Sequence, residues 1–416
     1  MTLRRINWAL ILLLVGFTGQ QFFFTTPITP IRLYMILIVV AVCVISVSLL
    51  FGKTFVIKLT LIDYALVGLY VYMIFTSLYA EDKNLAFQMV LGIIFLLAAY
   101  FVIRITAYQF SLDEFFNQLV IVAKVFFIWS FCWYIIGTSL HYVFKFPLVF
   151  ETSDAAQVVL YGTYYEGGVV PRFRGICNSP NNFGMYALLF GPILFSHAKS
   201  VSKWLKVIVF LSVLLTFSFT TYLAVISACI IIAFRKSLLW SYKFSPKSLI
   251  AVIIFSSLVF IGLIYIISSP LSQAIFEFIE FRTSRAQTGS GRFELFAFSV
   301  DLLHISPVFG EGLNQARLLL MPLRELKSTH NNFLEVMLEG GVFGLAFYLF
   351  LIFSLLFCLF DKSCSVKNKN WIKSTLIGMF IFSNANVTLY ADSLILSIAI
   401  ISTTVSYSIR KRNENE

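Results

Sequence analysis

Apolar stretches of about 20 residues recur along this chain, which is the length an α-helix needs to cross the hydrocarbon core of a bilayer. Hydrophobic residues make up 59% of its 416 residues and charged residues only 12%, whereas a soluble domain carries about 25%. Because a bilayer offers no water to backbone polar groups, the stretches favour helices over open strands. We therefore expect an all-α integral membrane protein with about twelve transmembrane helices, at 6–24, 30–50, 61–80, 85–103, 117–138, 181–197, 204–219, 221–234, 249–268, 333–360, 371–389 and 393–409.

The basic residues set the predicted topology. The formal net charge is +11, and 19 of the 31 Lys and Arg residues fall in short segments on one side of these spans. Cytoplasmic loops of membrane proteins carry such an excess, so we place this side and both termini in the cytoplasm. Topology then accounts for most of the positive charge, and no nucleic-acid partner is expected.

Two long segments, 139–180 and 269–332, interrupt the rhythm of short loops, and both fall on the predicted extracytoplasmic side. Loops of this length are usually functional or disordered. These two are rich in Tyr, Phe, Gly and Arg rather than in disorder-promoting residues. We expect residues 1–416 to form a single polytopic membrane domain, with the active site in these two loops.

Arg172, Arg174 and Arg292 lie in these outer loops, where positive charge is not needed for orientation. The guanidinium fork suits phosphate oxygens. Gly289-Ser290-Gly291 precedes a predicted helix start, where backbone N–H groups favour an anion. A diphosphate is the predicted ligand. Each arginine could instead pair with a lipid headgroup or with a carboxylate, namely Asp154, Glu166, Glu294 or Glu311.

The segment after Arg292 predicts a helix in the membrane interface. Its apolar residues share one helical face, while the acidic Glu294 and Asp301 point away from it. We expect Phe293, Phe296, Val300 and Leu303 to form that face and the helix to stop before Pro307.

His330 is the candidate catalytic residue, at the point where the second loop enters the span near residue 333. Histidine is the usual general base near neutral pH. Ser328 or Thr329 is the expected N-cap of that span. A polar stripe follows at four-residue steps and should face the protein interior or a wet cavity; it consists of Asn331, Glu335 and Glu339. A purely structural role for His330 and the stripe is equally open.

The remaining polar and small residues have less specific interpretations. Small residues at Gly340, Gly341 and Gly344 predict a close helix–helix approach. Asp63 and Asp392 could be relay groups or helix–helix contacts. The outer loops lack the acidic cluster of a divalent-metal site, so neither a metal nor another cofactor is expected.

Four short motifs follow one another between about residues 160 and 350. They are Arg172-Phe173-Arg174-Gly175 with Asn178-Ser179-Pro180-Asn181, then Gly291-Arg292, then Pro307-Val308-Phe309-Gly310-Glu311-Gly312, and finally His330-Asn331-Asn332-Phe333-Leu334 with Glu339-Gly340-Gly341-Val342-Phe343-Gly344. In order, spacing and sidedness they resemble the O-antigen polymerase and ligase superfamily.

The resemblance implies a GT-C-like, metal-independent, inverting glycosyltransferase whose donor is a glycan on undecaprenyl diphosphate. Residues at the positions of Arg172 and Arg292 would hold the diphosphate, with Arg174 as an alternative to Arg172. His330 would be the base toward the acceptor hydroxyl, with Gly291, Asn331, Glu335 and Glu339 in support. Family members often carry Ser-Arg where this chain has Ser218-Phe219-Thr220-Thr221, so a third basic contact is missing or comes from Arg174.

The acceptor distinguishes the activities that the resemblance allows. A polymerase of O-antigen, capsule or exopolysaccharide would use another lipid-linked glycan, and a chain-length regulator is a candidate partner. A ligase would use lipid A-core. Both would act at the periplasmic face of a bacterial inner membrane. A polysaccharide transporter or flippase with twelve spans is an alternative from another class, although no repeated halves are evident.

Overall fold

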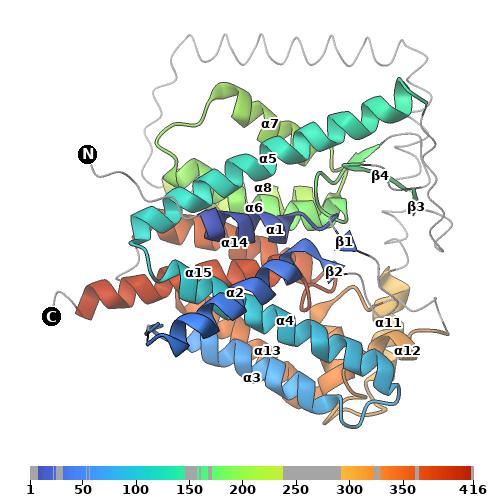
Figure 1. Cartoon of the computed structure of the whole chain (residues 1–416). Coiled ribbons are helices and arrows are strands. Elements are labelled where there is room, and N and C mark those ends of the chain that lie inside the picture. The colour runs from blue at the N-terminus through green and yellow to red at the C-terminus, as the bar shows by residue number, and fades with distance from the viewer. Residues whose placement is uncertain are drawn as a thin grey trace.

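The computed structural model describes residues 8–21, 23–24, 31–52, 54–55, 57–145, 157–158, 161–166, 171–237, 292–322, 328–360 and 365–413. Thirteen helices lie among these residues, many of them arranged along a common direction (Figure 1). They are α1 (Trp8–Thr18), α2 (Leu33–Leu50), α3 (Leu61–Thr76), α4 (Lys83–Ala107), α5 (Leu112–Tyr142), α6 (Pro180–His197), α7 (Lys203–Leu214), α8 (Phe219–Ser237), α11 (Arg292–Leu302), α12 (Ala316–Leu319), α13 (Asn332–Phe357), α14 (Val366–Ser383) and α15 (Asp392–Asn413).

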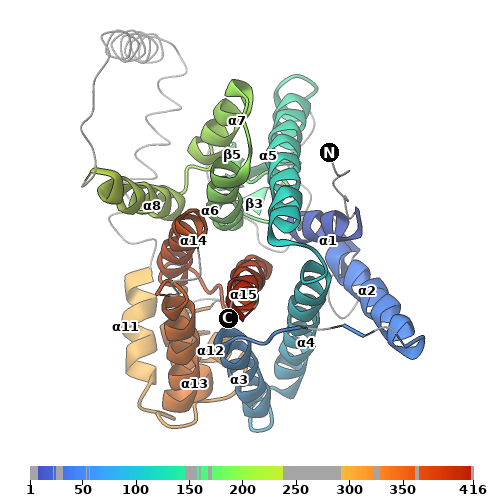
Figure 2. The same cartoon turned by 90° about the vertical axis from the view of Figure 1, so that its left-hand side faces the viewer.

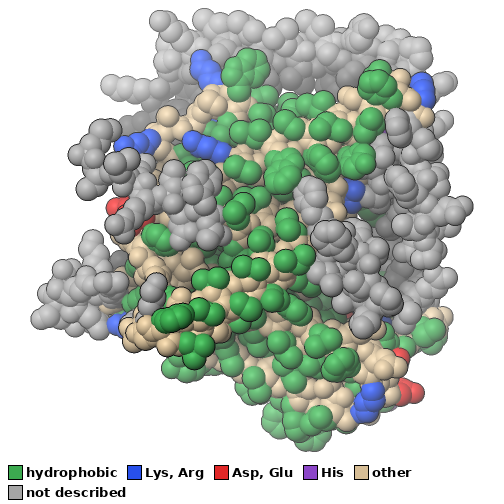
Figure 3. All heavy atoms as spheres, in the orientation of Figure 1, with side chains coloured by type: hydrophobic (Ala, Val, Ile, Leu, Met, Phe, Trp, Pro, Cys, Tyr) green, Lys and Arg blue, Asp and Glu red, His purple; other side chains and the backbone are tan. Residues whose placement is uncertain are grey.

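The helices confirm a mostly helical, multi-pass membrane protein. By length and composition, five described helices are able to cross a membrane, namely Leu33–Leu50, Lys83–Ala107, Leu112–Tyr142, Asn332–Phe357 and Asp392–Ile409. Hydrophobic side chains cover the middle of the face in Figure 3, and most of the visible charged ones lie toward its left and right. Each predicted span except 249–268, which is outside the described residues, coincides with a helix. The total of twelve spans and the GT-C-like arrangement stay predictions.

Five short strands gather near one end of the bundle, at the right of Figure 1. The antiparallel pair β1–β2 precedes α2, and a three-stranded sheet of order β3-β4-β5 precedes α6. We call this end, with the N-termini of α6 and α15, the strand end. The strands are β1 (Phe23–Phe24), β2 (Ile31–Arg32), β3 (Gln157–Val158), β4 (Thr163–Glu166) and β5 (Arg172–Phe173).

Helix α15 lies at the centre of the helices in Figure 2 and packs against α1, α3, α4, α6 and α14. Its buried hydroxyls bond to backbone carbonyls four residues earlier, as Ser397, Thr403 and Thr404 do at 2.7–2.8 Å. Small residues with satisfied hydroxyls let helices approach closely without exposing a polar group to lipid. This explains why the most enclosed candidate span is also the least hydrophobic of the five.

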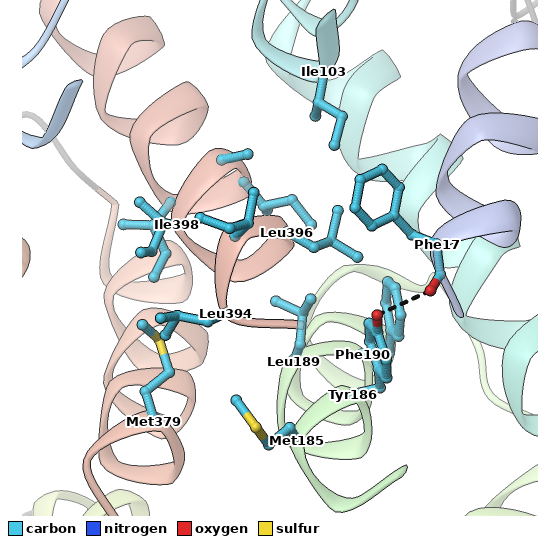
Figure 4. Packing of buried hydrophobic residues seen from close by; sticks show 14 of the residues in the cluster. Phe17, Ile103, Met185, Tyr186, Leu189, Phe190, Met379, Leu394, Leu396 and Ile398 are labelled. Carbon is cyan, nitrogen blue, oxygen red and sulfur yellow. Dashed lines mark hydrogen bonds between the residues drawn. The ribbon is translucent and has the colours of Figure 1, made fainter. Parts of the chain in front are cut away.

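An apolar core joins α1, α4, α6, α14 and α15 (Figure 4). Tyr186 on α6 is fully buried, and its hydroxyl donates to the carbonyl of Phe17 on α1 at 2.9 Å. That bond satisfies the one polar atom of the ring, as buried tyrosines require.

A buried ion pair joins the helices far from the strand end. Arg104 on α4 donates from Nε and Nη2 to the two carboxylate oxygens of Asp63 on α3, at 3.1 and 2.9 Å. Its Nη1 reaches the hydroxyl of Ser406 on α15 at 2.7 Å, and Tyr100 also donates to Asp63 at 2.7 Å. The structure therefore places Asp63 in a helix–helix contact, one of the two roles left open by the sequence.

Helix α13 folds back on itself at Gly341, where φ is 60° and ψ is −158°. The amide of Asn332 reaches the hydroxyl of Tyr348 at 3.1 Å, although sixteen helical residues would extend about 24 Å. The first arm, residues 332–340, therefore lies against the second arm, residues 342–357. The predicted span 333–360 coincides with α13, but its first third lies alongside the second arm rather than extending it.

The loop at 307–312 completes this break. The carbonyls that the break frees at Leu338 and Glu339 accept N–H bonds from that loop at 2.7 and 3.0 Å. The N–H of Val342 donates to the loop in return at 2.9 Å. A Cβ at Gly341 would overlap the loop backbone. Gly341 is thus needed for a chain reversal against a loop, and the predicted helix–helix approach holds instead for Gly340, whose position faces α3.

Helix α11 packs against α13. Among its described side chains, Leu295 and Ser299 are buried, whereas Val300 on the predicted apolar face is 54% exposed. The hydroxyl of Ser299 bonds to the carbonyl of Leu295 at 2.6 Å, so a serine is accommodated in the contact. An exposed Val300 is what an apolar face turned toward lipid would show, and the interfacial position of α11 stays a prediction.

Candidate functional site

Arg172 is held inward by its backbone and its side chain. In β5 it pairs with Tyr164 of β4, and its guanidinium lies 5.6 Å from the centre of that tyrosine ring. Its Nε donates to the carbonyl of Thr216, between α7 and α8, at 3.0 Å. The side chain is only 6% exposed, so three segments fix this cation at the strand end.

Arg174 is equally buried, at 7% exposure. Its Nη1 donates to the carbonyl of Asn178 at 3.3 Å, and its Nε has no hydrogen-bond partner among the described residues. Burial lowers the pKa of Arg174 to about 10, which still leaves it charged at neutral pH. A cation so placed is costly unless an anion accompanies it.

The loop at 171–179 that carries both arginines is fastened to the end of α1. Gln21 donates to the carbonyls of Gly175 and Cys177, the latter at 2.9 Å, and accepts a bond from the indole of Trp133 at 3.0 Å. The loop then enters α6, where Ser179 accepts the N–H of Asn182 at 3.1 Å. Ser179 is therefore the N-cap of α6, with Pro180 in the first turn.

Asp392, at the start of α15, supports the same loop. It accepts bonds from Tyr34 at 2.7 Å and Gln20 at 3.1 Å and forms an ion pair with Arg32. Gln20 in turn accepts the backbone N–H of Asn178 at 3.1 Å. Asp392 is therefore a contact between segments, the second role that the sequence left open. Sequence reasoning missed Gln20 and Gln21, whose signal was an amide pair directly after an apolar run.

His330 lies in a tight turn before the first arm of α13. It is half-buried, with a left-handed φ of 57°. The N–H of Thr329 donates to the carboxylate of Glu335 at 2.9 Å. Asn331, not Ser328 or Thr329, is the N-cap. Its side-chain oxygen accepts the backbone N–H groups of Phe333 and Leu334 at 2.8 and 3.2 Å. The hydroxyl of Thr329 instead stabilises the turn by donating to the carbonyl of Asn331 at 2.7 Å.

The two glutamates of the predicted stripe face the protein interior, as expected. Glu335 is 2% exposed and Glu339 is fully buried. Glu339 accepts a bond from Tyr390 at 2.7 Å, and its other oxygen has no hydrogen-bond partner among the described residues. Asn331 does not extend the stripe, since its side chain closes the helix end.

Asn332 is the buried amide that the sequence analysis did not single out. Its Nδ2 lies 3.0–3.1 Å from the hydroxyls of Tyr348, Ser383 and Thr388. Its Oδ1 accepts the N–H of Thr388 at 2.7 Å. The side chain thereby ties the first arm of α13 to the second arm and to the segment before α15. No sequence signal separates it from the neighbouring Asn331.

Four asparagines link the arginine loop to the His330 turn, and we call them the asparagine bridge: Asn181, Asn331, Asn384 and Asn386. Asn181, at the start of α6, donates to Asn386 at 3.3 Å. Asn331 donates to Asn384 at 3.5 Å. Because Asn384 and Asn386 belong to one short segment after α14, the two halves of the predicted site lie at either end of a continuous chain of contacts.

Arg292 and Gly291 are not placed in this arrangement. The backbone of Arg292 begins α11, but its side chain and all of Gly291 are outside the described residues. In the part of the chain that is described, no three His, Cys, Asp or Glu side chains gather where they could hold a metal ion. The roles of His330, Arg172, Arg174 and Arg292 stay predictions.

Comparison with known proteins points to one family. Residues 204–349 match the family model described as O-antigen ligase. This range includes α8, α11, the loop at 307–312, the His330 turn and the fold-back of α13, while the arginine loop precedes it. The match confirms the resemblance that the motifs indicated. A search of curated proteins finds no match to the chain.

Proposed function

We propose that this chain, which resembles the O-antigen polymerase and ligase superfamily over residues 204–349, is a membrane-embedded glycosyltransferase. Its donor is a glycan linked to undecaprenyl diphosphate, used at the periplasmic face of a bacterial inner membrane. One observation carries this proposal: two buried arginines on a single loop are joined by contacts to a turn that holds a half-buried histidine.

The arginine loop suits the diphosphate. Arg174 is buried without an ion-pair partner among the described residues, and the loop leads into the N-terminus of α6, where backbone N–H groups favour negative charge. Arg172 is the expected principal contact and Arg174 the alternative. Arg292 would supply a second cation from the other loop. Two guanidinium groups and a helix N-terminus would neutralise the leaving diphosphate as it departs.

His330 suits the role of base. The acceptor hydroxyl oxygen attacks the anomeric carbon and forms the new glycosidic bond, while the bond from that carbon to the diphosphate oxygen breaks and its electrons leave with the diphosphate. His330 takes the proton from the attacking hydroxyl. The attack occurs opposite the leaving group, so the anomeric configuration inverts. Glu335, which holds the neighbouring Thr329, would keep the imidazole in position.

An apolar cavity supports a lipid-linked donor. It has a volume of about 590 Å³ and is lined by residues of α8, α13, α14 and α15, from Lys373 near the middle of α14 to Ser383 at its C-terminal end. Ser383 and Tyr348 both line the cavity and bond to Asn332, two residues after His330. A polyprenyl tail would bury apolar surface in such a cavity.

Polymerase and ligase are both retained, because the motifs do not distinguish the acceptors and the matched family is described as a ligase. We place the polymerase of O-antigen, capsule or exopolysaccharide first. A strain lacking the gene decides between them: single repeat units indicate a polymerase, whereas long chains left on the carrier lipid indicate a ligase that uses lipid A-core. The transporter alternative predicts no transfer by purified protein in detergent.

The test of the proposed site compares His330→Ala and Arg292→Ala with His304→Ala, an exposed histidine outside it. Each of the first two variants should reduce glycan transfer in cells by at least about 10²-fold, the effect of losing one oxyanion-type donor or the base. Protein levels in the membrane should stay unchanged. Normal glycan chains in either variant would refute the assigned role.

A further inference from the structure

We propose that the asparagine bridge is the subsite for the first sugar of the donor, the one attached to the diphosphate. This inference rests on the proposed function. In displacement at an anomeric carbon, that carbon lies between the departing oxygen and the attacking oxygen. If the arginine loop holds the diphosphate and His330 faces the acceptor hydroxyl, the sugar ring belongs between them. The asparagine bridge connects these two segments.

The chemistry of the bridge fits a sugar. A carboxamide carries both a donor group and an acceptor, which matches hydroxyl groups that both donate and accept. Carboxamides are also uncharged, so they do not compete with the arginines for the diphosphate. All four asparagines are half-buried.

One donor in the bridge has no partner. The Nδ2 of Asn386 is shielded from solvent and forms no hydrogen bond with any described residue. A buried N–H₂ group without an acceptor is unfavourable, and a sugar hydroxyl or an acetamido carbonyl would satisfy it. The oxygen of Asn386 is already bonded to Asn181, and the oxygen of Asn181 accepts the hydroxyl of Ser218 at 2.6 Å.

The bridge is also rigid before any ligand arrives. The side-chain N–H₂ of Asn384 donates to the carbonyl of Phe380 at 2.8 Å, and the backbone N–H of Asn386 donates to Phe382 at 2.8 Å. Binding therefore needs little reordering. Asn181 and Asn386 are the expected sugar contacts, while Asn384 and Asn331 are positioning residues.

The experiment compares two ligands on the purified full-length protein. One is undecaprenyl diphosphate, which has no sugar, and the other is the undecaprenyl-diphosphate-linked glycan extracted from the producing cells. Asn181→Ala and Asn386→Ala should each weaken binding of the glycan-bearing lipid about 2- to 12-fold, the effect of one hydrogen bond to an uncharged group. Binding of undecaprenyl diphosphate should not change.

Asn368→Ala is the matched control, because Asn368 lies at the opposite end of α14 and bonds to His197 at 2.9 Å. It should leave both affinities unaltered. If Asn386→Ala lowers the thermal stability, Asn386→Leu, which has a similar volume and no hydrogen-bonding group, replaces it in the comparison.

Arg172→Ala distinguishes a failure of the proposed function from a failure of the sugar subsite. It should weaken binding of both ligands, and unchanged binding of both in the double variant Arg172→Ala with Arg174→Ala would overturn the proposed function itself. If Arg172→Ala weakens both but neither asparagine variant distinguishes the glycan-bearing lipid from the bare diphosphate, the sugar subsite is wrong and the proposed function stands. An equal loss for both ligands in Asn386→Ala would assign the bridge to support of the arginine loop.

Discussion

Replacing Arg104 with Met tests how far the buried ion pair between α3 and α4 holds the helices together. Arg104 is 1% exposed and Asp63 is 2% exposed, so the variant would leave a carboxylate without its counter-ion in a site that water does not reach. Removal of one partner of such a pair costs about 3–5 kcal/mol. Asp63 retains its bonds from Tyr100 and from Ser402, which favours the lower end, about 3 kcal/mol.

The measurement is the free energy of unfolding in detergent. The double variant Arg104→Met with Asp63→Asn should be less destabilised than the sum of the two single variants, because it leaves no buried charge. Lys83→Met is the control, since Lys83 is exposed and bonds only to a nearby carbonyl at 2.6 Å; it should change stability by less than about 0.5 kcal/mol. A loss below about 1 kcal/mol in Arg104→Met, or strict additivity in the double variant, would refute the reasoning.

Two further predictions concern α13. Gly341→Ala should lower the free energy of unfolding by at least about 2 kcal/mol, since the position has a positive φ and the added Cβ would overlap the backbone of Val308. The control is Gly92→Ala, where a Cβ meets nothing within 4 Å; it should be neutral or slightly stabilising in the same unfolding experiment. Equal effects of the two variants would contradict the fold-back. Asn332→Leu should cost about 1–3 kcal/mol because it leaves the buried backbone N–H of Thr388 without its acceptor, and it should also reduce glycan transfer. Unchanged stability would show that the first arm does not depend on this amide.

The positions of the helices could be predicted from the sequence because each depends on local properties. Runs of apolar residues located α1 to α8 and α13 to α15. That signal belongs to consecutive residues. The match over 204–349 likewise confirms a resemblance carried by short, continuous motifs.

One error arose where a distant segment decides the structure. The fold-back at Gly341 depends on the loop at 307–312, which supplies partners for the freed backbone groups. The loop that supplies these partners is not identifiable from the local pattern of α13 alone. The cap at Asn331 is a local error, because the turn that Glu335 holds through Thr329 moves the start of the helix past Ser328 and Thr329.

The sequence indicated which residue types belong to the candidate site but not the contacts that join them. Arg172, Arg174 and His330 carried recognisable chemistry, whereas Asn181 and Asn386 are 205 positions apart and have no shared motif. Asn332 resembles its neighbour in sequence but differs from it in environment. Residue type suggests which side chains could react. Only the packing shows which other side chains connect the reactive ones.

The reversal in α13 also constrains how related proteins could be recombined. A chimera that exchanges residues 307–312 without the segment through Val342 would combine a loop of one parent with the exposed backbone groups of another. A difference of one residue in loop length would leave the carbonyls of Leu338 and Glu339 without their present donors, and because both residues are buried, the loss would be costly. We therefore expect the two segments to be exchangeable only together, with junctions before Ser306 and after Val342.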